Sequence, residues 1–241
     1  MNIGLIFAGG VGSRMHSKEK PKQFLTIAGE PIIVHTIKHF QKCKSVDAVV
    51  VVCVKDWIDY FNKLVYKFRL TKVKAVVPGG ASGQLSIYNG LLEAKKLAKD
   101  EPSIVLIHDG VRPLINKELL KDNIECVQKH GSCITSAIVK ETIVEINDDF
   151  SIKTIPDRAH SRVAKAPQSF WLDDILSAHN TARESGITDF IDSCTMMTHY
   201  GKKLHMIDGP YENIKITTPD DFYTMRAILE AKENEQIYGL E

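Results

Sequence analysis

Short apolar runs rich in β-branched residues alternate along this chain with amphipathic patterns of helical length. This alternation predicts an α/β fold, with a Rossmann-like, twisted and largely parallel sheet covered by helices on both faces. The expected strands are Ile3–Phe7, Ala48–Val54, Val73–Val77, Ile104–His108, Cys133–Val139 and Leu204–Ile207. The expected helices are Pro31–Gln41, Asp56–Lys67, Gln84–Lys99, Lys117–Lys129, Leu172–Glu184 and Pro219–Lys232. The length of 241 residues suits a single domain over 1–241.

The stretch 140–166 interrupts this alternation. Two segments with β-forming residues, 142–146 and 151–155, flank the polar triplet Asn147-Asp148-Asp149, which predicts a β-hairpin. An isolated hairpin is marginally stable in water, so this one is expected to pack against something. We predict a projecting dimerisation arm that pairs with a second copy of the chain. An edge hairpin folded onto its own sheet is the alternative.

A glycine-rich loop follows the first expected strand. The run reads Ala8-Gly9-Gly10-Val11-Gly12-Ser13-Arg14-Met15, and Pro21-Lys22-Gln23-Phe24 comes shortly after it. Glycines let backbone N–H groups wrap a polyphosphate, and the two cations Arg14 and Lys22 would neutralise its charge. This combination favours a nucleoside triphosphate. A plain glycine turn with solvated cations is the alternative.

Two other phosphate-binding loops match this run poorly. The P-loop needs a Lys-Ser/Thr pair directly after its last glycine, whereas Ser13-Arg14 follows Gly12 here. The dinucleotide-binding fingerprint needs a third glycine, which is missing, and Glu30 lies in a turn rather than at the end of a second strand. A dehydrogenase is therefore disfavoured.

In parallel sheets of this class, ligands collect at the carboxyl ends of strands, here after Phe7, Val77 and Ile107. Gly79 and Gly80 follow the third expected strand and permit close backbone approach to a base or ribose, with Ser86 in the next helix as a donor or an ordinary cap. Asp109 directly follows the fourth expected strand and is suited to Mg²⁺, unless it forms a structural pair with Arg112. Lys215 lies between two isoleucines, and we expect it on a strand, pointing into the cleft.

Bulk properties restrict the partners. The 31 Lys and Arg balance 30 Asp and Glu, giving a net charge of +1, so no global field attracts nucleic acid. The apolar run at the N-terminus is short and has no charged region before it, which argues against a signal peptide or a membrane partner. The five cysteines are scattered without a Cys-x-x-Cys pair, which argues against a disulfide framework or a zinc site. We expect a cytoplasmic protein.

The motifs occur together in the order of one family. They are Gly-Gly-Val-Gly-Ser-Arg-Met, Pro-Lys-Gln-Phe, Gly79-Gly80 with Ser86, His108-Asp109-Gly-Val-Arg-Pro, Arg158, Pro167-Gln168-Ser-Phe, Asp192 and Asn213-Ile-Lys-Ile-Thr. From Ile3 to about Ile228 the chain resembles the small cytidylyltransferases that make CDP-methylerythritol or CDP-ribitol. Details within the family look more like the ribitol 5-phosphate branch, namely Phe24, Asp56-Trp57, Ile155-Pro156-x-Arg158-Ala159-His160 and Asp192-x-Cys194.

The resemblance implies a nucleotidyltransferase fold and a homodimer joined through the arm. It implies that CTP and a polyol phosphate react to give a CDP-polyol and pyrophosphate with Mg²⁺ as cofactor. The acceptor would be D-ribitol 5-phosphate, or alternatively 2-C-methyl-D-erythritol 4-phosphate. Catalytic roles are implied for Arg14, Lys22 and Lys215. Nucleotide binding is implied for Ala8, Gly9, Gly10, Gly12, Gly79, Gly80, Ser86 and Asp109, with Asp109 also holding the metal. Substrate binding is implied for Arg112, Arg158, Asp192 and Thr217.

Two departures from the family pattern stand out. First, Gly83 occupies a position where the family usually has arginine. Second, Arg162 stands at a usually aromatic position, and Lys165-Ala166 stands where the family usually has Gln-Thr before Pro-Gln. The added cations predict a different or more acidic acceptor. The departures also leave open a nucleotide-binding module without turnover, which the presence of all four residues Arg14, Lys22, Asp109 and Lys215 disfavours.

Overall fold

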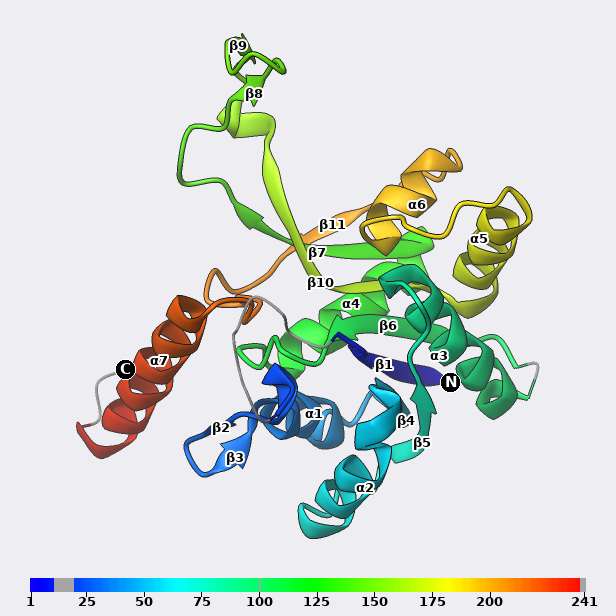
Figure 1. The fold of residues 1–241 in the computed structure, drawn as a ribbon, viewed down its shortest axis with the longest axis vertical. Helices are drawn as coiled ribbons and strands as arrows, with labels where there is room; N and C mark the ends of the chain where they lie inside the picture. Colours follow the sequence, from blue (N-terminus) through cyan, green and yellow to red (C-terminus); the bar gives the residue numbers. More distant parts are fainter. Residues whose placement is uncertain (11–19, 100, 239–241) are drawn as a thin grey trace.

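The computed structural model describes residues 1–10, 20–99 and 101–238, with the backbone alone for 235–238. A seven-stranded sheet forms its centre, in the order β11-β7-β10-β6-β1-β4-β5 (Figure 1). Its strands are β1 (Asn2–Ala8), β4 (Ala48–Cys53), β5 (Val73–Pro78), β6 (Ile104–Asp109), β7 (Ser132–Ile138), β10 (Arg162–Trp171) and β11 (Met206–Asp208). The helices are α1 (Ile32–Lys42), α2 (Ile58–Lys67), α3 (Gly83–Ala98), α4 (Lys117–His130), α5 (Leu172–Glu184), α6 (Ser193–His199) and α7 (Pro219–Tyr238).

The predicted largely parallel sheet is confirmed. Strand β1 lies between β6 and β4 and runs parallel to both, with Ile3 opposite Val105 on one side and Ala48 on the other. β5 continues this parallel arrangement at one edge, and β11 pairs with β7 in parallel at the other. Only β10 runs antiparallel, between β6 and β7. Because six strands share one direction, their carboxyl ends meet along a single edge of the sheet.

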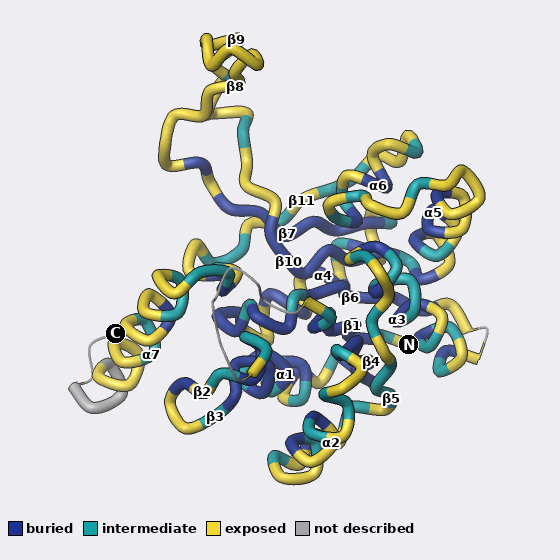
Figure 2. The backbone as a smooth tube through the Cα atoms, in the orientation of Figure 1, coloured by how far each residue is buried: buried dark blue, intermediate teal, exposed yellow. Residues whose placement is uncertain are grey.

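Helices cover both faces of the sheet, as predicted. One apolar cluster joins a face of the sheet to α1, α2 and α4 through residues such as Phe40, Phe61 and Leu120. A second cluster joins the opposite face to α3, α5 and α6 through residues such as Leu91 and Ile175. Strands β1, β4, β6, β7 and β10 are accordingly buried over most of their length, whereas the edge strands β5 and β11 are not (Figure 2). Strands buried on both faces explain why the expected runs were continuously apolar rather than alternating.

Strand β10 was not predicted as part of the sheet. The reason is polar sequence within it, because Gln168 and Ser169 are buried there and interrupt the apolar pattern. Ser169 Oγ donates to Asn123 Oδ1 at 2.9 Å, which satisfies a hydroxyl that burial would otherwise penalise. The expected arm boundary at residue 166 therefore falls inside β10, whose residues Gln168–Trp171 pair with β6. Helix α6 was also missed, and α7 continues past the expected end at Lys232.

The hairpin does project from the body, between β7 and β10 (Figure 1). Its two strands, β8 (Glu145–Ile146) and β9 (Ile152–Thr154), are shorter than the expected segments 142–146 and 151–155. Its apolar side chains have no core to enter in this protomer. Those that stand exposed are Ile143, Val144, Ile146, Phe150, Ile152 and Ile155. The alternative of a hairpin folded onto its own sheet is therefore wrong.

Candidate functional site

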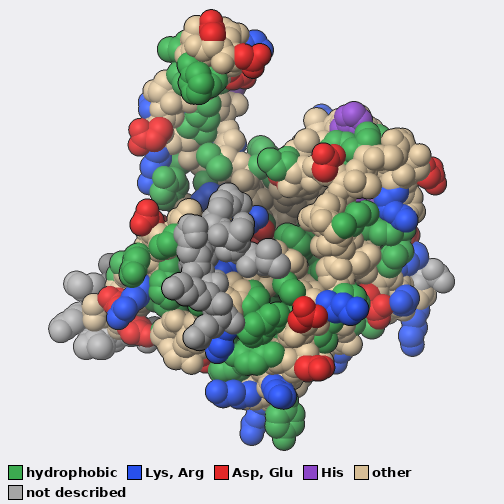
Figure 3. All heavy atoms as spheres, viewed as in Figure 1, with side chains coloured by type: hydrophobic (Ala, Val, Ile, Leu, Met, Phe, Trp, Pro, Cys, Tyr) green, Lys and Arg blue, Asp and Glu red, His purple; other side chains and the backbone are tan. Residues whose placement is uncertain are grey.

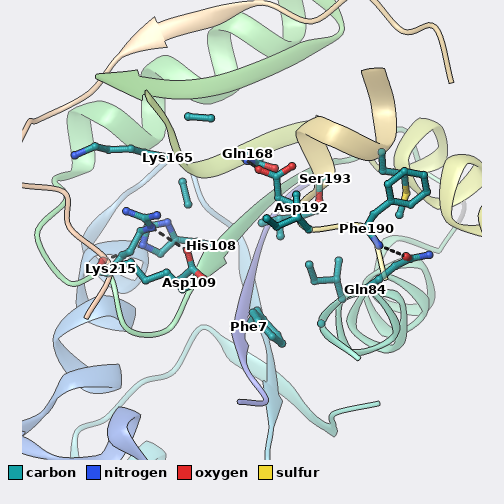
Figure 4. Close-up of a pocket in the computed structure, with 18 of the residues that line it drawn as sticks. Phe7, Gln84, His108, Asp109, Lys165, Gln168, Phe190, Asp192, Ser193 and Lys215 are labelled. Carbon is teal, nitrogen blue, oxygen red and sulfur yellow. Dashed lines mark hydrogen bonds and ion pairs between the residues drawn. The ribbon is translucent and has the colours of Figure 1, made fainter. Parts of the chain in front are cut away.

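A cavity of about 240 Å³ opens at the carboxyl edge of the sheet. It appears in Figure 3 as a hollow beside the base of the arm. Its walls come from strand ends, from the start of α3, from β10 and from the loop that precedes α6. Lining residues from these elements include Phe7, Asp109, Gln84, Lys165, Asp192 and Lys215 (Figure 4). The site thus lies where parallel-sheet topology predicts it.

Asp109 is the charged centre of this cavity. Its Oδ1 accepts from Lys215 Nζ at 2.7 Å, and its Oδ2 accepts from Arg112 Nε at 2.9 Å. Burial acts to raise the pKa of Asp109, but the attraction and hydrogen bonds of Lys215 and Arg112 outweigh it and lower the pKa to about 2. The carboxylate is therefore ionised at neutral pH and orients two cations toward the same space.

Arg112 is fixed by contacts on several sides. Beyond its bond to Asp109, its Nη1 donates to the backbone carbonyl of Asn213 at 2.9 Å. Its own backbone carbonyl accepts from His108 Nε2 at 2.9 Å. Burial lowers the pKa of His108 to about 4, so this imidazole is neutral at pH 7 and acts as a donor to Arg112. The guanidinium is held with little conformational freedom to lose when an anion binds.

Lys215 reaches Asp109 from a segment without regular secondary structure, so the expectation of a strand there is wrong. Ile214 and Ile216 pack into a third apolar cluster with α7, and Lys215 turns the other way, into the cavity as predicted. The Ile216 N–H donates to the Val111 carbonyl at 2.9 Å, which ties this segment to the loop after β6. The two elements that carry Lys215 and Asp109 are therefore joined by backbone as well as by charge.

The glycine positions after β1 and β5 meet beside the start of α3. A Cβ added at Gly79 would lie 3.2 Å from Ser86 Oγ and 3.5 Å from Gly9 Cα, so a side chain there would be tight against the Ser86 hydroxyl. Ser86 Oγ accepts from the Gly80 N–H at 2.9 Å and donates to the Ser82 carbonyl at 2.8 Å. Ser86 therefore holds the loop in shape, while Ser82 caps α3 by accepting from the Leu85 N–H.

Gln23 organises the start of the first glycine loop. Its buried Nε2 donates to the carbonyls of Ala8 and Gly10, at 2.8 and 3.3 Å. The short 3-10 turn η2 (Lys22–Phe24) that carries it is anchored by Phe24, whose ring stacks on Trp57 with 5.2 Å between centroids. Because Gln23 bonds to two carbonyls of the glycine loop, the turn that begins with Lys22 is held against that loop.

A cation-lined cavity at the carboxyl edge of a parallel sheet suits transfer chemistry on a nucleotide, and comparison with known proteins identifies the family. The family model described as 2-C-methyl-D-erythritol 4-phosphate cytidylyltransferase (IspD) matches residues 3–231. The chain belongs to the IspD family of cytidylyltransferases. It is therefore a nucleotidyltransferase, as the motif order predicted, and the dehydrogenase alternative is wrong.

Relatives within the family carry two names. The ribitol-5-phosphate cytidylyltransferase of Streptococcus agalactiae serotype V is 60% identical over 240 residues, covering 100% of both chains. The 2-C-methyl-D-erythritol 4-phosphate cytidylyltransferase of Clostridium acetobutylicum is 39% identical over 231 residues, covering 95% of this chain and 97% of the relative. A solved structure, 4-diphosphocytidyl-2C-methyl-D-erythritol synthase from Anaerococcus prevotii, superposes with a TM-score of 0.82 at 27% identity and covers 95% and 96% of the two chains. The expected nucleotidyltransferase fold is confirmed.

The cytidylyltransferase motifs are not all brought to the cavity. Arg14 and Gly12 lie outside the described residues. Arg158 is exposed on the arm, in the 3-10 turn η4 (Arg158–His160), where its Nη1 donates to the Lys140 carbonyl at 3.3 Å. Thr217 lies beside the site without lining it, and its Oγ1 donates to the Lys215 carbonyl at 3.2 Å.

Asp192 lines the cavity of this cytidylyltransferase and also caps a helix. Its Oδ1 accepts from the Thr195 N–H at 2.7 Å, at the start of α6, and its Oδ2 accepts from Gln168 Nε2 at 3.1 Å. Each carboxylate oxygen can accept more than one hydrogen bond, so capping leaves capacity for a ligand hydroxyl. The predicted substrate role of Asp192 is compatible with its position.

Two glutamines fix this wall of the cavity. Gln168 belongs to one of the family motifs, whereas the sequence analysis did not single out Gln84. Gln84 Nε2 donates to the Ile187 carbonyl at 2.8 Å, and its Oε1 accepts from the Phe190 N–H at 2.9 Å. Gln168 Oε1 accepts from the Cys194 N–H at 2.9 Å. These amides attach the loop before α6 to the start of α3 and to β10. The available signal in the sequence was the position of Gln84, directly after the departure from the family pattern at Gly83.

The departures from the family pattern divide between the cavity and the surface. Gly83 and Lys165 line the cavity, whereas Arg162 pairs with Asp208 at 3.4 Å and does not line it. A Cβ at Gly83 would meet only Phe7 Cζ, at 3.9 Å, so the missing side chain leaves open space. Of the two added cations, Lys165 alone reaches the site.

The described residues offer one carboxylate suited to a metal ion bound together with a nucleotide. They contain no cluster of three or more His, Cys, Asp or Glu side chains that could hold an ion alone. Mg²⁺ is commonly bound by one or two carboxylates plus substrate phosphates. The low pKa of Asp109, about 2, keeps that ligand ionised. The Asp109–Arg112 pair that the sequence left as the alternative is present. Because each carboxylate oxygen can accept more than one bond, Asp109 keeps capacity for Mg²⁺ delivered with the triphosphate.

Proposed function

We propose that this cytidylyltransferase transfers CMP from CTP to D-ribitol 5-phosphate and releases CDP-ribitol and pyrophosphate. The observation that carries the choice of acceptor is full-length similarity at 60% identity to a protein named for that reaction. Relatives named for 2-C-methyl-D-erythritol 4-phosphate are more distant, at 39% identity and below, and supply the alternative acceptor.

The arrangement of charge supports direct transfer. A phosphate monoester has a second pKa of about 6, so the acceptor is already a dianion near neutral pH and needs no general base. One of its oxygens attacks the α-phosphorus of CTP, the new P–O bond forms, and the bond to pyrophosphate breaks with its electron pair leaving on pyrophosphate. Two anions must first approach each other. Lys215 and Arg112, both oriented by Asp109, offset that repulsion.

The nucleotide is assigned to the two glycine loops. Gly79 and Gly80, ordered by Ser86, contact the cytosine and ribose, and the backbone of Ala8, Gly9 and Gly10 faces the triphosphate. Lys22 adds charge stabilisation from the turn that Gln23 attaches to this loop. Arg14 and Gly12 keep their proposed phosphate-binding roles from the motif alone.

Two further contacts are assigned to substrate and cofactor. Asp192 accepts hydrogen bonds from the polyol hydroxyls, because its carboxylate lines the cavity. Asp109 would hold Mg²⁺, which would neutralise triphosphate charge when it is bound together with CTP. EDTA is expected to abolish turnover, and added Mg²⁺ is expected to restore it. Full activity in EDTA would contradict the metal assignment.

The arm is assigned to a homodimer interface. Exposed apolar side chains at its tip, such as Phe150 at 84% and Ile152 at 61% exposed, would be covered by a second copy. Arg158 on that arm would then contribute to acceptor binding in the partner's cavity. Sedimentation of the intact chain and of a Phe150→Asp variant tests this assignment, because only the variant is expected to sediment as a monomer.

We assign the reaction to the cytoplasm. All five cysteines are free, which is typical of a reducing compartment. None of the helices in the described ranges combines the length and apolar character needed to cross a bilayer.

Pyrophosphate release tests the acceptor. Ribitol 5-phosphate and 2-C-methyl-D-erythritol 4-phosphate are supplied in parallel with CTP and Mg²⁺, and kcat/KM is measured for each. A higher value for ribitol 5-phosphate is expected. A higher value for the erythritol compound would transfer the proposal to the alternative, and turnover of neither would favour a module without turnover.

A further inference from the structure

Lys165 is a buried cation that the proposed mechanism does not use. Its side chain lines the cavity, yet the residue is only 9% exposed. The hydrogen bond described for its ammonium runs to the backbone carbonyl of Tyr211, at 2.7 Å. Among the described residues no carboxylate lies within ion-pair distance of it, whereas Arg112 and Lys215 share Asp109. A buried ammonium without a paired anion is unfavourable unless a ligand supplies the anion.

The backbone around Lys165 is adapted to this placement. Strand β10 pairs with β7 through Ala164 and again from Gln168, and the register shifts between these two residues. Irregularities of this kind re-aim side chains and are frequent beside active sites. Lys165 lies within the irregular stretch. A regular strand would have continued the pairing with β7 through this position.

Neighbouring charges increase the excess of positive charge. Lys140 Nζ lies 3.4 Å from the centre of the Tyr211 ring, and Lys165 Nζ lies 5.1 Å from the same centre. Burial lowers the pKa of Lys165, and repulsion from Arg112 and Lys140 acts in the same direction against the attraction of Glu212. This side of the cavity is therefore prepared for an anion that carries more than one negative charge.

The position of Lys165 distinguishes between the two substrates. In Figure 4 it lies on the Lys215 side of the cavity, away from Gln84 and Phe190. Gln84 belongs to the start of α3, directly after the glycine loop assigned to the nucleotide. Lys165 thus lines the side of the cavity that lies away from the start of α3, which the assignment of the nucleotide leaves to the acceptor.

We propose that Lys165 binds the phosphate of the polyol phosphate acceptor. The inference rests on the proposed function, because it assigns the phosphomonoester dianion of the same acceptor to a named cation. It differs from the proposed role of Arg158, since Lys165 acts from within the protomer that holds the cavity.

Steady-state kinetics of three variants test this role. Lys165→Gln removes the charge with similar length, Lys165→Arg keeps the charge, and Lys63→Gln makes the same neutralisation at an exposed position on α2. We expect Lys165→Gln to raise KM for ribitol 5-phosphate roughly 10- to 100-fold, the scale of a lost charge-assisted hydrogen bond, with KM for CTP changed less than about twofold. Lys165→Arg is expected to recover most of this loss, and Lys63→Gln to match the wild type.

A merely structural lysine would give a different pattern. If Lys165 only held the Tyr211 carbonyl, Lys165→Gln would lower thermal stability and reduce kcat without a selective change in acceptor KM. An unchanged acceptor KM, or an equal rise for CTP, would overturn the proposal.

Binding measurements separate this inference from the proposed function. Calorimetry compares ribitol 5-phosphate with unphosphorylated ribitol, on the wild-type protein and on Lys165→Gln. If ribitol 5-phosphate binds the wild type more tightly than ribitol and Lys165→Gln reduces that difference roughly 10-fold or more, the phosphate role of Lys165 stands even if the wild type fails to turn over. If the difference in Lys165→Gln equals that in the wild type, the role is rejected even if the enzyme is active.

Discussion

Replacing Asp109 by asparagine should destabilise the protein by an amount that the structure sets. The pKa of Asp109 is lowered from 3.8 to about 2, and its side chain is only 15% exposed. A difference of about 2 pKa units between the unfolded and folded states corresponds to about 2.5 kcal/mol at pH 7. Asp109→Asn keeps the shape but loses the charge, so a loss of at least about this size is expected.

The two partners of Asp109 should contribute unequally to this loss. Arg112 is 14% exposed and Lys215 is 42% exposed, so solvent screens the second pair more strongly. Double-mutant cycles are expected to give a coupling of about 2 kcal/mol for Asp109 with Arg112 and below about 1 kcal/mol with Lys215. Urea unfolding of the single and double variants measures both values. Equal couplings, or the reverse order, would refute the burial argument.

The effect should depend on pH with a definite sign. Because the folded-state pKa is the lower one, the contribution is present above the unfolded value near 4 and is lost as pH falls through about 2. The difference between wild type and Asp109→Asn should fall to about half by pH 3. Asp208→Asn is the matched control, because Asp208 forms a surface ion pair with Arg162 and its side chain is 73% exposed. This substitution should change the free energy of unfolding by less than about 1 kcal/mol. A loss for Asp109→Asn as small as this control, or one independent of pH, would refute the reasoning.

Three other substitutions test separate parts of the structure. Lys22→Ala should lower kcat roughly 10²- to 10³-fold, the scale of one lost charge-stabilising donor, and wild-type turnover would remove Lys22 from the mechanism. Gln23→Met deletes the amide that donates to the carbonyls of Ala8 and Gly10. The KM for CTP should therefore rise roughly tenfold while the KM for the acceptor stays constant. A rise in both KM values would contradict a local role of Gln23 in the glycine loop. Gly90→Ala would place a Cβ 2.7 Å from Val52 Cγ2. This overpacking should reduce the free energy of unfolding by about 1–3 kcal/mol. A thermal midpoint equal to that of the wild type would show that the core accommodates the added methyl group.

Much of the fold was predictable because the buried parallel strands are continuously apolar. All six expected strands exist, with bounds that differ by one or two residues at most ends, since β-branched runs such as Ala48–Cys53 have no competing pattern. Strand β10 escaped prediction because its polar residues are satisfied by side chains from distant elements, as with Ser169 and Asn123. Hydrogen bonds between residues far apart in sequence leave no local pattern.

The site was predictable where a motif carries the residue and less so where tertiary contacts define its role. Asp109 and Lys215 were expected in the same cleft, and the structure places their side chains 2.7 Å apart. Ser86 was considered a ligand donor or a cap, but its hydroxyl instead bonds to the loop at Gly80. Gln84 acquires its role from the loop before α6, which packs against it only after folding.

The most direct test of the account follows oxygen atoms through the reaction. The enzyme is supplied with CTP, Mg²⁺ and ribitol 5-phosphate whose non-bridging phosphate oxygens carry ¹⁸O. The products are then separated, and the ¹⁸O content of each is measured by mass spectrometry. Attack of the acceptor phosphate on the α-phosphorus of CTP predicts that every labelled oxygen is retained in CDP-ribitol and that pyrophosphate is unlabelled. Label in pyrophosphate, loss of label from the CDP product, or no CDP-ribitol at all would contradict the account.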